Sequence, residues 1–167
     1  IVITGAGVVS PIGIGLDPYW SSISNRVTGI RRLELADEAP LPYPMGAPIP
    51  DFDPKAYVKP RKSMKVMCRE IQTGFAAAEM AIEHAQLDTE QVDSDRMGVV
   101  YGRDMLYCDV SELAKAYQIC LREDGFVFDQ WGARAINELY PLWMLRYLPN
   151  MTACHVGIRH DARGPNN

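Results

Sequence analysis

The first thirteen residues restrict the fold more than any other part of the chain. Ile1–Thr4 is a mostly β-branched, apolar run, and Gly5-Ala6-Gly7 follows it. Neither face of such a run has a side chain that needs water, so it predicts a strand buried on both faces in the middle of a sheet. Met97–Gly102 has the same character and predicts a second buried strand.

A nucleotide-binding loop is one interpretation of the first turn. Thr4–Gly7 is similar to the start of such a loop, where glycines let backbone N–H groups approach a pyrophosphate. However, Ser10 and Pro11 lie near the positions of the later glycines, and Pro11 and Gly13 prevent a helix from starting there. We therefore expect no cofactor, and a small nucleotide-binding oxidoreductase is kept as an alternative.

The bulk composition is that of an ordinary globular domain, with 167 residues of which 47% are hydrophobic. A net charge of -4 argues against a nucleic-acid or anionic-membrane surface. The short basic cluster Lys59–Lys65 is interpreted as a solvated helix start. Cys68, Cys108, Cys120 and Cys154 are widely spaced, so we expect neither a metal site nor disulfides, and a cytoplasmic setting. No stretch approaches eighteen apolar residues, so no membrane span is expected.

Helical spacing dominates the chain from Ser63 onward. The strongest helix is predicted over Ser63–Gln86, with apolar residues at steps of three and four. Asp109–Glu112 is a capping box for a helix that reaches about Arg122. Further helices are predicted over 129–139, from Pro141, and over 151–160. Strands that alternate with helices indicate an α/β fold.

Several segments together resemble the β-ketoacyl synthases, which are condensing enzymes of the thiolase-like fold. Each segment is short, but all of them occur in the order and at the spacing of that family. They are Ile3–Gly13, Gly46–Pro54, Met67–Gln72, Met97–Gly102, Pro149–Met151 and Ala162–Asn166.

The resemblance implies an α-β-α-β-α sandwich of two similar halves, each a mixed sheet with helices on both faces. Residues 1–167 would form most of the N-terminal half, and we expect them to be truncated at both ends. In the family, a Cys at a helix N-terminus takes an acyl group from a thioester, and two histidines of the other half assist a decarboxylative Claisen condensation. The implied partners are acyl carrier protein or CoA thioesters, and the implied assembly is a homodimer.

The resemblance places the nucleophile just after Asn167, so no catalytic residue is expected in this chain. Thr152-Ala153-Cys154 nevertheless spells the three residues that end in the nucleophile of many family members, and His155 follows it. Because this triplet precedes Gly164–Asn166, whereas the family's nucleophile follows that signature, we interpret Cys154 as a buried structural thiol. A catalytic Cys154 is the alternative.

Two positions match the family's acyl pocket. Met105 matches a residue that gates acyl-chain length, and Trp143 matches an aromatic residue that a dimer partner contributes to the same pocket. The alternative is that both are core residues. Arg103, Asp104 and Leu106 depart from the Gly- and Ser-rich loop of the family, which leaves room for a specialised or non-condensing member.

The resulting hypothesis is the N-terminal part of a β-ketoacyl-acyl-carrier-protein synthase of fatty acid or polyketide synthesis, inactive by itself. The alternative is a non-catalytic, ketosynthase-like partner subunit of the chain-length-factor type.

Overall fold

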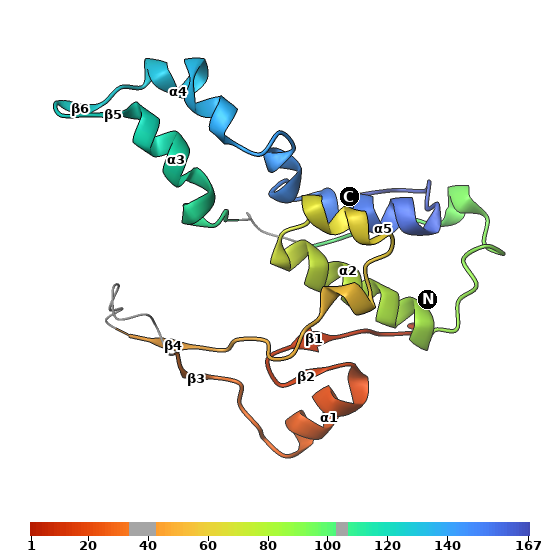
Figure 1. Ribbon diagram of the computed structural model, residues 1–167. Helices are drawn as coiled ribbons and strands as arrows, with labels where there is room; N and C mark the ends of the chain where they lie inside the picture. Colours follow the sequence, from red (N-terminus) through yellow and green to blue (C-terminus); the bar gives the residue numbers. More distant parts are fainter. Residues whose placement is uncertain (34–42, 103–106) are drawn as a thin grey trace.

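Two helices that pack side by side form the centre of the structure (Figure 1). The computed structural model describes residues 1–33, 43–102 and 107–167. The central pair is α2 (Arg69–His84) and α5 (Met151–His160). Residues 107–146 extend away from this pair as a lobe, and the N-terminal segment with α1 (Leu16–Ser24) lies on another side.

The other elements are short. In the described ranges, two-residue strands pair antiparallel as β1 (Val9–Ser10) with β2 (Gly13–Ile14), β3 (Arg31–Arg32) with β4 (Met45–Gly46), and β5 (Leu121–Arg122) with β6 (Gly125–Phe126). The remaining helices, with η marking 3-10 turns, are η1 (Pro54–Ala56), η2 (Arg61–Val66), η3 (Ser94–Arg96), α3 (Val110–Cys120), α4 (Asp129–Ala133), η4 (Ala135–Glu138) and η5 (Trp143–Arg146). None of the helices in the described ranges has the length and apolar character needed to cross a membrane.

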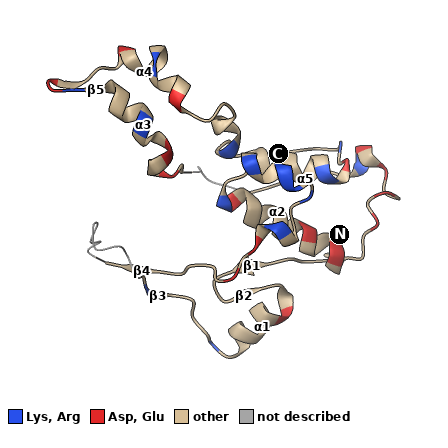
Figure 2. Cartoon of the chain, viewed as in Figure 1, with Lys and Arg blue, Asp and Glu red and all other residues tan. Residues whose placement is uncertain are grey.

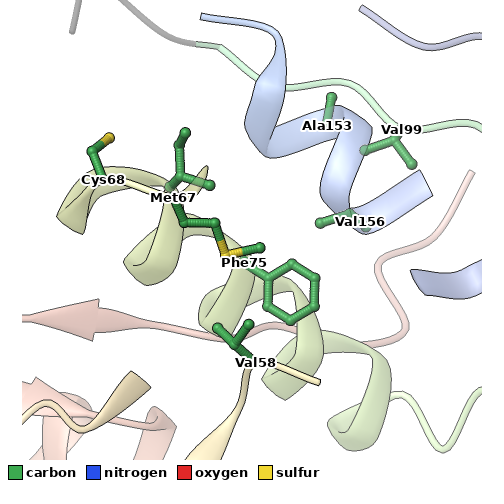
Figure 3. Close-up of a cluster of buried hydrophobic side chains, with 8 residues drawn as sticks. Val58, Met67, Cys68, Phe75, Val99, Ala153 and Val156 are labelled. Atoms are coloured by element: carbon green, nitrogen blue, oxygen red, sulfur yellow. The ribbon is translucent and has the colours of Figure 1, made fainter. Parts of the chain in front are cut away.

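The main core lies between α2, α5 and the residues that precede α2 (Figure 3). Burial of each large side chain contributes roughly 1.5–3 kcal/mol, so these contacts dominate the stability of this region. The apolar face predicted for the long helix is confirmed by its buried side chains. The buried members of the core are Val58, Met67, Cys68, Ile71, Phe75, Val99, Ala153 and Val156.

The single long helix predicted over 63–86 is instead two elements. The 3-10 helix η2 ends at Val66, Met67 is extended, and α2 begins at Arg69. Met64 still packs against the core that buries Met67, although the α-helix is interrupted. The predicted face is therefore right and the predicted extent is wrong.

The predicted buried strand at the N-terminus is not formed. Ile1 and Ile3 are exposed, and no described strand pairs with residues 1–4. A strand buried on both faces needs neighbouring strands and a covering layer on each side. The described residues supply no such neighbours, so the run lies open.

Two glycines of this segment instead run directly against α2. A Cβ atom added at Gly5 or Gly7 would overlap the carbonyl oxygens of Ala81 and Ala77, respectively. Glycine is required at both positions because the backbone passes close to α2. The sequence had suggested a close approach to a pyrophosphate instead.

The second predicted strand pairs with the end of the chain. Val99 forms a parallel bridge with Asn166. Asn167 donates its N–H to the Val99 carbonyl at 3.0 Å and accepts the Tyr101 N–H at 2.7 Å. Val99 is buried and Val100 is exposed, so the strand is covered on one face instead of two.

The C-terminal half follows the sequence predictions more closely. The Asp109 carboxylate accepts the Ser111 N–H at 2.8 Å and caps α3, so the cap is confirmed, but the Glu112 carboxylate pairs with Arg146 instead of completing the predicted box. The helix ends at Cys120. The bounds of α5 match the prediction. The helix predicted over 129–139 is divided into α4 and η4, and the hairpin β5–β6 was not predicted.

We expect Phe75→Ala to lower the free energy of unfolding by about 3–5 kcal/mol, because the ring is 1% exposed and its loss leaves a cavity. Phe128→Ala is the matched control, since that ring is 75% exposed and its loss should change stability by less than about 0.5 kcal/mol. Urea unfolding of both variants measures the difference, and equal losses would contradict the packing described here.

Candidate functional site

The lobe carries the one predicted substrate residue that can be placed. Trp143 is the first residue of η5 and is half-buried. Its ring lies 5.3 Å from that of Tyr147, measured between centroids. The indole N–H is buried and has no hydrogen-bond partner among the described residues. Met105 lies outside the described residues.

A small second core supports the lobe. Ala116 and Cys120 on α3 pack against Ala135 at the start of η4, and all three are fully buried. Their small side chains bring the two elements close together. The larger rings of Trp131 and other aromatic residues close the sides of this contact.

An apolar cavity of about 410 Å³ opens beside this core. It lies within the usual size range of small-molecule sites, which is about 300–1,000 Å³. None of the described residues that line it is charged. Its walls come from α4, η4, η5 and the turn between the last two, through Trp131, Gly132, Ile136, Leu139, Tyr140, Pro141, Trp143 and Met144.

A polar cluster fixes η5 against α3 next to this cavity. Arg146 forms an ion pair with Glu112 at 2.7 Å, and the Arg146 guanidinium lies 5.7 Å from the centre of the Tyr147 ring. Burial raises the pKa of Tyr147 to about 12, and its hydrogen bond with the Glu112 carboxylate acts in the same direction, whereas Arg146 opposes the shift. Tyr147 therefore remains a neutral hydrogen-bond donor across the physiological range.

Cys154 lies inside α5 and not at its start. The helix begins at Met151, and the Cys154 N–H donates to the Asn150 carbonyl at 3.0 Å. The thiol is half-buried and unoxidised, and the Asn150 side-chain amide approaches its sulfur at 3.6 Å. No hydrogen bond joins it to His155 among the described contacts.

The imidazole of His155 is partly buried. Its Nε2 atom is buried without a hydrogen-bond partner among the described residues. Burial lowers the pKa of His155 below its ordinary value, and a hydrogen bond with the Val66 backbone opposes the shift. The neutral imidazole is therefore the form that the fold favours.

Sequence reasoning missed the polar contacts between the ends of α2 and α5, which carry opposite charges (Figure 2). His160 hydrogen-bonds with Glu79 and contacts Thr89, and Arg159 lies 3.8 Å from the same carboxylate. No periodicity could indicate Glu79, because it is 81 residues away in sequence.

Asp53 caps η1 by accepting the Lys55 N–H at 3.0 Å. Within the described ranges, no three His, Cys, Asp or Glu side chains come together as a set that could hold a metal ion.

Solved structures with the same arrangement of elements are ketosynthases of the thiolase-like α/β fold. A beta-ketoacyl synthase from Burkholderia phymatum superposes with a TM-score of 0.72 at 24% identity, over 98% of this chain and 37% of that chain. The ishigamide ketosynthase/chain length factor gives 0.69 at 20% identity, over 99% and 38%. The predicted fold class is confirmed, although the individual strands are shorter than predicted.

The family model of the beta-ketoacyl synthase N-terminal domain matches residues 1–167, so the chain belongs to this family. A Streptomyces halstedii protein whose name describes a polyketide beta-ketoacyl synthase is 37% identical over 165 residues. The 3-oxoacyl-acyl-carrier-protein synthase 2 of Coxiella burnetii is 28% identical over 166 residues. Each match covers 99% of this chain and 37% of the relative, so the chain spans little more than a third of these proteins.

Arg146→Met should destabilise the protein by about 1–3 kcal/mol, because the half-buried Glu112 carboxylate would lose its charged partner. Arg134→Met is the matched control: Arg134 lies in the same lobe, is exposed and has no ion pair among the described contacts. Urea unfolding at low and at high salt tests this, and equal stability of the two variants would count against the polar cluster.

The depressed pKa of His155 also predicts a pH dependence. The unfolded chain binds more protons than the folded one below about pH 6.5, so this histidine's contribution is present above that pH and is lost as the pH falls. His155→Gln should therefore flatten the plot of unfolding free energy against pH between 7 and 5, by at most about 1.4 kcal/mol per pH unit. Parallel curves for the two proteins would be the contrary result.

Proposed function

We propose that the chain is the N-terminal part of a β-ketoacyl-acyl-carrier-protein synthase. The observation that carries this proposal is the family match across residues 1–167. The intact protein would join an acyl thioester and a malonyl thioester in fatty acid or polyketide synthesis, as a cytoplasmic homodimer and without a cofactor. Its partners would be acyl carrier protein or CoA thioesters.

The reaction has two steps. A cysteine thiolate attacks the acyl thioester carbonyl, and the thiol of the carrier leaves with a proton. The malonyl thioester then loses carbon dioxide, and its α-carbon attacks the acyl-enzyme carbonyl to form the carbon–carbon bond. The cysteine is released, and the product is a 3-oxoacyl thioester.

We place the proposed nucleophile just after Asn167, because Gly164–Asn166 resembles the segment that precedes the family's nucleophile. Asn167 lies beside Val99 and Tyr101, and parallel neighbours run in the same direction. Met105 is proposed as the chain-length residue.

Trp143 is proposed to contribute to the acyl pocket of the partner protomer. The described residues that line the cavity beside it are uncharged and mostly apolar, which suits a hydrocarbon chain. Cys154 is proposed to be structural, because its own N–H is used within α5 and the free donors of a helix start lie elsewhere.

A non-catalytic partner subunit of the chain-length-factor type is the second candidate. The sequence at Arg103, Asp104 and Leu106 favours it, because these side chains are bulkier and more polar than the family's usual loop. Such a subunit would keep the fold and lack the reactive cysteine.

The test is acylation of the intact protein. We expect mass spectrometry of peptides to find the acyl group on a cysteine C-terminal to Asn167, and substitution of that cysteine to lower the condensation rate by at least about a thousandfold. Cys154→Ser is the control and should keep most of the rate. Acyl groups on the peptide that contains Cys154 would overturn the assignment, and no acyl-enzyme at all would favour the partner subunit.

A further inference from the structure

The cavity of the lobe is unusual in the kind of apolar side chain that forms it. Three of its wall residues are the aromatic Trp131, Tyr140 and Trp143. Aliphatic side chains fill the space between the rings.

Other rings hold two of these wall residues in place. The Trp131 ring lies 5.2 Å from that of Tyr117 at 64° and 6.4 Å from that of Phe126, between centroids. Trp143 lies against Tyr147, which the Glu112–Arg146 pair holds. These two rings are thus held by neighbouring side chains, and they lose little side-chain entropy when a ligand binds.

Such walls discriminate between two kinds of acyl chain of equal length. A saturated chain has many rotatable bonds, and ordering them is costly. A conjugated chain is planar and rigid, and its π-system can pair with aromatic rings in offset or edge-to-face geometry. Each such pair is worth roughly 2- to 10-fold in affinity beyond the area that it buries.

We propose that this cavity selects planar, conjugated acyl groups over saturated chains of the same length. The inference rests on the proposed function, in which this part of the lobe extends the acyl pocket. It adds the class of substrate: a polyenoyl or aryl-substituted acyl thioester, whose double bonds have been kept by the reactions that supply it.

Calorimetry on the intact protein tests the selection without any need for turnover. The probes are amide analogues of pantetheine thioesters, which carry a decatetraenoyl, a decanoyl or a cinnamoyl group. We expect the decatetraenoyl probe to bind at least about fivefold more tightly than the decanoyl probe. The cinnamoyl arm tells whether an aryl group alone is sufficient.

Three variants locate the selection. Trp143→Leu should remove most of the preference for the conjugated probe. Trp143→Phe, which keeps an aromatic ring, should retain that preference. Trp20→Leu is the matched control, because Trp20 is 68% exposed on α1 and does not line the cavity. Equal affinities for the two ten-carbon probes, or a preference that survives Trp143→Leu, would overturn the inference.

The same probes separate this inference from the proposed function. Acyl-enzyme formation without any preference would overturn the substrate class and leave the condensing function intact. A preference that depends on Trp143, found in a protein that forms no acyl-enzyme, would support the cavity and overturn the condensing function.

Discussion

The contact between α2 and α5 is the constraint on which the rest of the structure depends. It requires a glycine, because a Cβ atom at Gly74 would lie 2.9 Å from Thr152 Cγ2. Tyr101 uses the same opening and donates its hydroxyl to the Gly74 carbonyl. The strand before the lobe and both central helices therefore meet at one residue. Any larger side chain there would separate the helices and remove the support for Val99, which lies in the same core.

The lobe depends on a different kind of packing, and this difference bears on function. Its core is three small buried side chains with Trp131 and Leu139 packed against them, and one ion pair joins α3 to η5. Tyr147 packs against the main core and also against Trp143, so it joins the lobe to α2 and α5. Wall residues on the lobe core, such as Trp131, can change in sequence with less effect on α2 and α5, and the proposed substrate selection is placed there.

The sequence predicted elements whose signals are local. The Asp109 carboxylate accepts a hydrogen bond from the amide only two residues further along the chain. Helix α5 is bounded by turn residues on both sides. It failed where the outcome depends on distant residues. Ile1–Thr4 has the composition of a buried strand, but no neighbouring strand is present among the described residues. Trp143 was identified only through a family resemblance, because the cavity beside it joins side chains from three short elements without periodicity.

The structural role proposed for Cys154 depends on its position within α5, which the local motif does not encode. The reactivity of a cysteine at a helix start comes from free backbone N–H groups and from the positive end of the helix dipole. At the fourth residue of α5, the cysteine N–H already donates to Asn150, and the thiol meets an amide side chain. A cysteine in the same Thr-Ala-Cys triplet would have a different environment at the N-terminus of a helix. Position relative to the helix start, which composition does not encode, decides whether the sulfur reacts or packs.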